Sequence, residues 1–423
     1  HKAVLGENYE DTFDITVKAE DFKFGIERTL SEQTGSADAP LFSAVKSIST
    51  PDDFTIVFNL SYADDNFLYA LTNPGAMPCD EEFFNLTNGK YGLDAKYLLC
   101  NGPFHVSKWT EKTSVKLAKN NEYNGESSVS PSSVTFYINN DDSEVADKMN
   151  SVTYDVAFLS SSQFSSIENK KDLNSVAVQN VTYSFIFNQN DNNYRNKNMR
   201  LAFCRSCDTS SLFDSQSDIS KADGIVPPSC KIGGEDYRNG NAAELLSYDE
   251  TLAKKNFNDA LLELGSSSVE TTILCTEQYE PFVKQMVQKL QKTLGVKFVS
   301  TVKVVSESDL EAAVNDGNYS VAFYPFKAKS SFAGEIIEGF DQNNIFGYES
   351  DVLSQKIRNI KNNSGSLEGE RSAVADAENY LVSEAVIMPV FYENSYFVTS
   401  KKTSGIYFYS SADNVCFINA KKS

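Results

Sequence analysis

The sequence predicts an α/β protein with more than one lobe. Residues 270–305 carry a strand pattern, an amphipathic helix pattern and a second strand pattern, the order of a β-α-β unit with parallel strands. The chain has 423 residues, which exceeds the size at which one hydrophobic core usually stops growing. A late strand pattern at 386–391 returns the chain toward the first lobe. We therefore expect two lobes and a chain that leaves the first lobe and re-enters it.

Strand and helix patterns follow one another through the first 160 residues. Residues 15–30 place Phe22, Ile26 and Leu30 at the spacing of one helix face. A second helix begins at Phe67 and ends at Asn73-Pro74-Gly75. The other patterns of this part predict a helix at 143–150 and strands at 44–48, 55–60, 134–138 and 154–159.

The central stretch, residues 181–208, has the pattern of a strand, a polar loop and a helix. Apolar residues alternate with polar ones from Val181 to Asn188, the two-residue period of a half-buried strand. A run rich in Asn, Asp and Arg follows, and an apolar pattern suited to a helix extends from Met199 to Cys207. Residues 209–223 are rich in Ser and Asp and predict a loop.

Further helix and strand patterns follow residue 248. The helix at 248–265 ends at Gly265, a residue that suits the left-handed conformation of a helix C-cap. Further strands are predicted at 270–275, 296–305, 319–324 and 386–391. Further helices are predicted at 281–294, 309–315, 351–360 and 371–384.

Charge and chemistry exclude several functions. The 58 acidic and 38 basic residues give a net charge of −20, which repels nucleic acid phosphates and anionic lipid headgroups. No run of about 18 apolar residues predicts a membrane span. Histidines occur only at His1 and His105, and no Gly-x-Ser-x-Gly, His-Glu-x-x-His or phosphate-loop pattern is present. We therefore expect no enzyme, no metal or cofactor and no nucleic acid partner, and we expect His105 to have a structural role in a strand.

The seven cysteines leave several states open. One bridge, Cys79 to Cys100, would close the polar loop between them and stabilise the fold by about 3 kcal/mol. The alternative is seven reduced thiols. Cys204 and Cys207 have Cys-x-x-Cys spacing but lack the second pair that a zinc site requires, so we expect a structural role for them. The others are Cys230, Cys275 and Cys416.

Four stretches of the sequence contain distinctive motifs. They are Asn101-Gly102-Pro103-Phe104 on a stretch ending at Trp109, Asn120-x-x-Tyr123-x-Gly125, the strand-loop-helix stretch at 181–208, and Val226-Pro227-Pro228. These motifs resemble those of family 5 solute-binding proteins, the oligopeptide, dipeptide and nickel receptors of bacterial ABC importers. The helix at 15–30 is similar to the family's Thr-Ala-Glu-Asp helix, with Lys18 in place of Thr.

The resemblance implies a two-lobe periplasmic-binding-protein-like fold of type II, in its large three-subdomain variant, with a ligand cleft between the lobes. We expect residues 1–178 to form an accessory subdomain of lobe I from which the N-terminal strands of the family are missing. The core of lobe I is expected at 179–265 and 390–423, and lobe II at 266–389. The chain starts at His1, without Met or a signal peptide, so we expect a processed or trimmed form.

A candidate ligand loop also follows from the resemblance. Residues 324–329, Tyr-Pro-Phe-Lys-Ala-Lys, align with the family's Gly-Trp-x-Ala-Asp-Tyr loop, in which the Asp holds a peptide's α-amino group. Phe326 takes the place of Trp and Lys329 that of Asp, so a ligand carboxylate or a peptide in another register is favoured there. Alternatively, Lys327 and Lys329 lie on a solvated loop, as lysines usually do.

Other candidate residues for the wall of the cleft come from three places. Aromatic side chains tolerate varied ligand groups, although each of these residues could instead belong to the core or the surface. Met77 lies where family members bring a loop of the first lobe to the cleft. The candidates are Tyr324, Tyr407, Tyr409 and Met77.

The resemblance implies a monomeric extracellular receptor that captures oligopeptides by hinge closure and delivers them to the transmembrane subunits of an ABC permease. Its expected location is the cell surface, through a lipid anchor, or the periplasm. Two alternatives remain: an oligosaccharide receptor of the same fold, or a surface sensory or interaction protein that has no role in transport.

Overall fold

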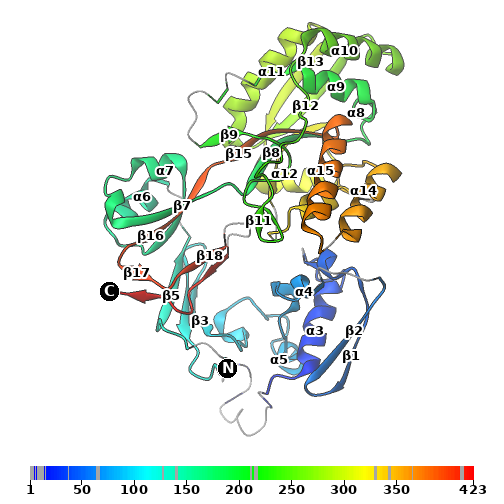
Figure 1. The fold of residues 1–423 in the computed structure, drawn as a ribbon. Coiled ribbons are helices and arrows are strands. Elements are labelled where there is room, and N and C mark those ends of the chain that lie inside the picture. Colours follow the sequence, from blue (N-terminus) through cyan, green and yellow to red (C-terminus); the bar gives the residue numbers. More distant parts are fainter. Residues whose placement is uncertain are drawn as a thin grey trace. The chain divides into compact units, whose positions relative to one another are not determined.

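The computed structural model describes residues 4, 6, 14, 16–36, 38–62, 67–125, 128–138, 142–209, 212–213, 218–327, 331–341, 344–363, 365–409 and 414–423. Contacts between residues divide the chain into two compact units, drawn as a ribbon in Figure 1. Unit 1 comprises His1–Asp142, Lys402–Tyr407 and Cys416–Ser423. Unit 2 comprises Ser143–Lys401 and Phe408–Val415.

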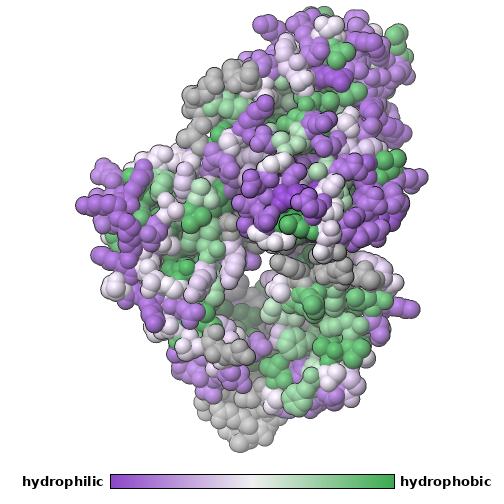
Figure 2. Space-filling view, viewed as in Figure 1, coloured by the Kyte–Doolittle hydropathy of each residue, from purple (hydrophilic) through white to green (hydrophobic). Residues whose placement is uncertain are grey.

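Unit 1 contains a helix that packs on a hairpin. Ile26 of the helix and Phe42 belong to one buried cluster, against which Ile48 and Phe58 of the hairpin pack. The helix is α3 (Ala19–Leu30), and the antiparallel hairpin is formed by β1 (Val45–Asp52) and β2 (Thr55–Leu60). Figure 2 shows apolar residues gathered over α3 and this hairpin. The helix and strands predicted for this part of the chain are confirmed.

Helix α3 also positions the segment that contains Met77. The N–H of Cys79 donates to Asp21 O at 2.9 Å. Gly25 lies so close to the backbone of Met77 that a Cβ at this position would overlap the Met77 carbonyl oxygen. The absence of a side chain at Gly25 therefore allows the Met77 segment to lie directly on the helix.

The rest of unit 1 consists of short helices and small sheets. The helices are η1 (Ala39–Phe42), α4 (Phe67–Ala70), η2 (Pro74–Ala76), α5 (Glu81–Leu86) and η3 (Ala95–Tyr97). An antiparallel sheet has the order β3-β4-β5, with β3 (Phe104–Thr110), β4 (Ser114–Lys119) and β5 (Ser133–Tyr137). His105 lies in β3, as predicted. A second small sheet pairs β17 (Thr403–Ser404) with β20 (Lys421–Lys422).

Unit 2 is built around a six-stranded mixed sheet. The strand order is β13-β12-β14-β8-β15-β9. Strand β12 pairs in parallel with β13 and β14, as the β-α-β pattern predicted, while β8 pairs antiparallel with both β14 and β15. The strands are β8 (Val181–Phe187), β9 (Ile219–Lys221), β12 (Val269–Cys275), β13 (Phe298–Val304), β14 (Val321–Lys327) and β15 (Ile387–Glu393).

Helices cover both faces of this sheet. Residues of α9 (Lys197–Ser206), α10 (Glu250–Leu264) and α11 (Glu280–Leu294) form one hydrophobic core with the sheet, which we call the α9–α11 face. Residues of α12 (Glu307–Asn315), α13 (Gly334–Glu338), α14 (Asp351–Asn362) and α15 (Leu367–Ser383) form the core on the opposite face, which we call the α12–α15 face. Helix α10 ends at Gly265 in the left-handed conformation, with φ of 63°, as predicted.

The central strand β8 differs from its prediction. Its alternating pattern indicated one buried and one exposed face, but Thr182 and Ser184 on the polar face are fully buried. Helices cover both faces of the sheet, and β8 lies between two other strands. The small hydroxyl side chains therefore lie in the core on the α12–α15 face.

Unit 2 also contains a three-stranded sheet with the order β6-β16-β7. The chain passes between the two sheets of unit 2 twice, from β7 to β8 at Gln179 and Asn180 and from β15 to β16 at Asn394. The strands are β6 (Val156–Ser160), β7 (Leu173–Val178) and β16 (Ser395–Ser400), with α6 (Asp142–Asn150) and α7 (Ser161–Ser166) beside them in the chain.

The large sheet runs across the boundary that we expected between lobes at residue 265. Strand β8, placed with lobe I by the sequence, pairs with β14, which was placed with lobe II. One hydrophobic core includes both Phe185 and Ile273. Residues 179–265 and 266–389 therefore share one sheet and its cores, because β8 and the later strands pair through long-range contacts that a local pattern does not reveal.

The structure contains no disulfide, and all seven cysteines are free thiols. The expected bridge from Cys79 to Cys100 is absent. Cys79 is buried and accepts a hydrogen bond from Arg28 Nη1 at 3.7 Å, whereas Cys100 is exposed.

Candidate functional site

The candidate site is the edge of the large sheet at which the parallel strands end. Strands β12, β13 and β14 end at Cys275, Val304 and Lys327. Strand β8 runs antiparallel to both β14 and β15, so β15 has the same direction as β14. The same edge therefore contains Val181 at the start of β8 and Glu393 at the end of β15. Ligands of open α/β sheets bind outside the carboxyl ends of the parallel strands. We call this region the carboxyl edge.

Three of the predicted ligand residues lie together on β14. Side chains alternate between the two faces of a strand, and Tyr324 and Phe326 both pack on the α12–α15 face. Phe326 is only 9% exposed and stacks on Phe340 with ring centroids 5.7 Å apart. Phe326 thus anchors the end of β14 in the core, while Tyr324 is half-buried and Lys327 is exposed.

The remaining predicted residues do not lie on this strand. Met77 and Tyr407 are exposed residues of unit 1. Tyr409 is exposed in unit 2, at the end of the strand β18 (Tyr407–Tyr409), which forms a small sheet with β19 (Asn414–Cys416). Lys329 lies outside the described residues. The role of these residues in ligand binding stays a prediction.

Sequence reasoning missed an acidic residue at the carboxyl edge, Glu393. Its Oε1 accepts a hydrogen bond from the hydroxyl of Tyr279 at 2.7 Å. Burial raises the pKa of the Glu393 carboxyl, and the Tyr279 hydrogen bond and the positive charge of Lys327 oppose this effect. A carboxylate directly after an apolar strand was the available signal in the sequence.

Aromatic rings pack together beside Glu393. The ring centroid of Tyr183 lies 4.3 Å from that of Tyr279 and 5.1 Å from that of Phe391. Burial raises the pKa of the Tyr279 and Tyr183 hydroxyls, so both remain protonated and able to donate hydrogen bonds.

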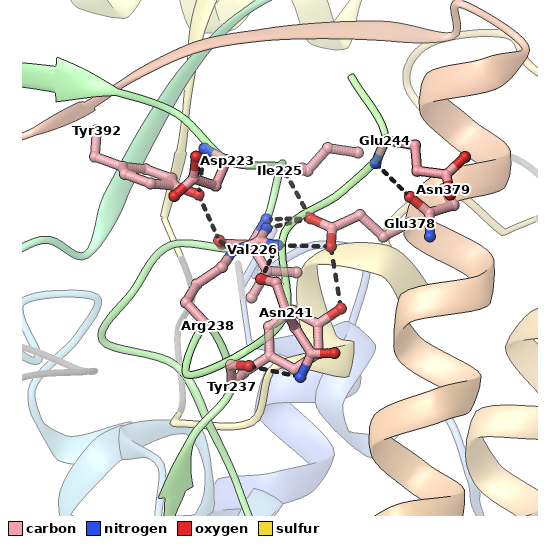
Figure 3. A network of polar contacts seen from close by, with 10 residues as sticks. All are labelled: Asp223, Ile225, Val226, Tyr237, Arg238, Asn241, Glu244, Glu378, Asn379 and Tyr392. Carbon is pink, nitrogen blue, oxygen red and sulfur yellow. Dashed lines mark hydrogen bonds and ion pairs between the residues drawn. The ribbon is translucent and has the colours of Figure 1, made fainter. Parts of the chain in front are cut away.

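A network on the opposite face of the sheet fixes the end of β15 (Figure 3). The hydroxyl of Tyr392, the residue before Glu393, accepts a hydrogen bond from Asp223 N at 3.0 Å. Burial raises the pKa of Tyr392 to about 12. Strand β15 is thus tied to the segment that begins at Asp223 and contains the Val226-Pro227-Pro228 motif.

That segment is held on α15 by a buried ion pair. Glu378 of α15 accepts hydrogen bonds from Ile225 N at 2.7 Å and Val226 N at 3.0 Å, and it pairs with Arg238. Figure 3 shows these groups converging on the Glu378 carboxylate. A Cβ at Gly224 would overlap both charged groups, so glycine is required for this close approach.

A second polar cluster joins the two chain passages between the sheets of unit 2. Gln179 Nε2 donates to Asn394 Oδ1 at 2.7 Å and to Ser220 Oγ at 2.8 Å. Ser220 Oγ in turn donates to Asn394 Oδ1 at 3.1 Å. These bonds connect Gln179 of the first passage and Asn394 of the second passage with Ser220 of β9. Asn394 directly follows Glu393.

The described residues show neither a metal cluster nor a reactive Cys-x-x-Cys pair. They contain no group of three or more metal-ligating side chains, and none of their helices could cross a membrane. Cys204 and Cys207 are buried, and burial raises the pKa of the Cys204 thiol to about 12, so these cysteines are protonated and unreactive. Cavities of about 370 Å³ beside Cys204 and about 400 Å³ beside Lys303 do not include the end of β14.

The class of the protein follows from its match to a known family. The family described as bacterial extracellular solute-binding proteins, family 5 Middle, matches residues 13–346. The chain belongs to this family, whose members bind solutes and are not enzymes.

Known relatives agree with this assignment. The dipeptide-binding protein DppE of Bacillus subtilis (strain 168) is 23% identical over 95% of this chain and 77% of its own length. An oligopeptide ABC transporter substrate-binding domain from Bacillus anthracis str. Ames has a TM-score of 0.78 at 19% identity, covering 96% of this chain and 84% of its own. Listeria monocytogenes OppA bound to peptide has a TM-score of 0.77 at 21% identity, with the same coverage. The fold is the two-lobe periplasmic-binding fold.

Proposed function

We propose that the protein is the extracellular receptor of an ABC importer, which binds oligopeptides by closing two lobes around them and delivers them to the permease. The family match over residues 13–346 carries this proposal. The relative from Bacillus subtilis is named for dipeptide binding, and the Listeria protein of the same fold was solved with peptide. Closure requires no covalent chemistry, because a ligand that contacts both lobes stabilises the closed form.

The ligand site of this receptor includes the carboxyl edge. An extended peptide pairs its backbone with protein backbone groups and places its side chains in alternate pockets. Lys327 and Lys329 offer positive charge to a ligand carboxylate after the buried anchor Phe326. The other residues that we assign to the walls of the site are Tyr324, Met77, Tyr407 and Tyr409.

The hinge lies at the two chain passages near Gln179 and Asn394. These are the places where unit 2 changes from its small sheet to its large sheet and back. The hydrogen bonds of Gln179 to Asn394 and Ser220 hold the two passages together, so they bend as one joint. In this assignment the large sheet with its helices forms one complete lobe.

The receptor acts as a monomer at the cell surface, held there by a lipid anchor, or in the periplasm. Its partners are the peptide and the transmembrane subunits of the permease. The net charge of −20 disfavours nonspecific binding to nucleic acid or anionic lipid.

Native mass spectrometry of the purified protein, followed by thermal unfolding with added ligands, tests this function. We expect a retained mass that decomposes into amino acid residues, and a melting temperature that rises with peptide concentration as binding to the folded state requires. Oligosaccharide mixtures should cause no shift. Stabilisation by oligosaccharides alone would show that the ligand is a sugar and not a peptide. No stabilisation by either class of ligand would contradict the proposed role as a transport receptor.

A further inference from the structure

Glu393 and Lys327 lie on the same face of the sheet at the carboxyl edge. Phe391 of β15 pairs with Tyr183 of β8, and both rings belong to the core on the α9–α11 face. Side chains alternate along a strand, so Glu393 points to the same face as Phe391, two residues earlier. Lys327 follows the core residue Phe323 by four residues and reaches the same face from the other side of β8.

Tyr279 orients the carboxylate of Glu393. Its hydroxyl donates to Glu393 Oε1 at 2.7 Å, and its ring packs between Tyr183 and Phe391 with centroid distances of 4.3 and 5.3 Å. The second oxygen, Glu393 Oε2, accepts no hydrogen bond from the residues that the structure describes. An ionised carboxylate has about four acceptor sites, so the group retains capacity for a ligand donor.

The charges around Glu393 favour a cation. Asp218 and Glu307 add negative charge at this end of the sheet, and Lys327 adds one positive charge. Among the residues that the structure describes, the carboxylates of Glu393, Asp218 and Glu307 therefore outweigh the positive charge of Lys327. The tyrosine rings beside Glu393 also attract cations through their electron-rich faces.

Building on the peptide-receptor function proposed above, we propose that Glu393 binds a primary ammonium group of the ligand and that Tyr279 positions its carboxylate. The ammonium donates to Glu393 Oε2, while Tyr279 continues to hold Oε1. Such an ammonium comes either from the peptide's N-terminus or from a lysine side chain, because both present the same chemistry.

Four tetrapeptide pools test this assignment. They have a free or an acetylated N-terminus, each with or without lysine. Thermal unfolding at pH 7 with each pool is compared for the wild type, Glu393→Gln and Glu270→Gln. Glu270 is exposed near the start of β12, at the other end of the strand from the carboxyl edge, so this variant removes the same charge without changing the site.

We expect Glu393→Gln to bind the ammonium-bearing pools about 10-fold to 100-fold more weakly than the wild type does, since hydrogen bonds to charged groups have this magnitude. Glu270→Gln should match the wild type. A loss with the lysine-free pool of free N-termini assigns Glu393 to the α-ammonium. A loss confined to lysine-containing pools assigns it to the side chain.

The other outcomes separate this inference from the receptor function. Unchanged binding of all pools by Glu393→Gln, or an equal loss for the acetylated lysine-free pool, would overturn the role of Glu393 and leave the receptor function intact. A wild type that none of the pools stabilises would overturn both.

A second variant, Tyr279→Phe, tests the positioning role with the ring retained. The Tyr279 hydrogen bond lowers the pKa of Glu393, so its loss raises that pKa. Binding of the ammonium requires the ionised carboxylate, and the pH below which binding is lost should therefore move upward in this variant. An equal loss of affinity at every pH would indicate a structural role alone and contradict positioning.

Discussion

Glu378 illustrates how one buried acid can organise a loop. Its side chain is 1% exposed and that of Arg238 is 7% exposed. Burial lowers the pKa of Arg238, but the charge and hydrogen bonds of Glu378 outweigh this effect and raise the pKa above its usual value. Arg238 is therefore charged, and its attraction to Glu378 compensates for the hydration that burial removes.

Replacing Glu378 by Gln should destabilise unit 2 by about 3 to 5 kcal/mol, because it leaves the buried Arg238 charge without a counter-ion. Urea unfolding measures this loss. Glu250→Gln is the matched control, since Glu250 forms an exposed pair with Lys254 one helical turn away and exposed pairs contribute little. Equal changes in both variants would contradict the importance of burial.

At the scale of elements, β8 is the strand whose surroundings matter most. Its pattern is that of a strand with one polar face, but Thr182 and Ser184 are fully buried. Neither side-chain hydroxyl has a hydrogen-bond partner among the described residues. A buried hydroxyl without a partner is unfavourable because it loses its hydrogen bonds to water.

Thr182→Val should therefore increase the free energy of unfolding by about 1 kcal/mol, as it replaces an unpaired hydroxyl by a methyl group of similar size. Chemical denaturation of the variant checks this. Thr301→Val, on an exposed position of β13, controls for the change of residue type. A destabilised Thr182→Val protein would mean that water or a ligand contacts this hydroxyl.

At the scale of the whole molecule, the thiols report on folding. Cys100 is exposed and Cys416 is half-buried, while the other five cysteines are buried. Burial raises the pKa of Cys275 to about 11 and that of Cys230 to about 12, which suppresses the reactive thiolate.

Titration with a thiol reagent should therefore modify Cys100 first in the native protein and all seven cysteines after denaturation without a reductant. Cys100→Ser should remove the rapid native reaction. A total of five thiols after denaturation would contradict the free state and restore the possibility of one bridge, such as Cys79 to Cys100.

The helices and strands of both units were largely predictable because their signals are local. The apolar spacing that predicted 281–294 matches α11, and the left-handed C-cap at Gly265 ends α10 where its sequence indicated. The strand β9 was missed because its three residues, Ile219–Lys221, lie at the end of a stretch that resembles a loop. The extended conformation of β9 is set by its pairing with β15.

The candidate site was predictable only in part. The resemblance to the family identified the end of β14 as a candidate ligand site. It did not identify Glu393, which contacts Tyr279. Their hydrogen bond joins residues 114 positions apart, and its formation depends on how β15 and the short helix Glu277–Tyr279 before α11 pack beside β8. Phe326 was predicted to face the ligand; the structure shows that its ring packs on Phe340 and Phe346, and its contact with the ligand stays a prediction.

By itself, the sequence determined the α/β class, the order of elements and the family, because periodicity, capping residues and ordered motifs are properties of neighbouring residues. Only the tertiary structure decided that β8 joins β14 and β15 in one sheet across residue 265, and that Cys79 and Cys100 are free thiols. It also decided that Glu393 meets Tyr279. These features depend on the register and packing of distant segments, which are set by the burial of whole faces and not by local pattern.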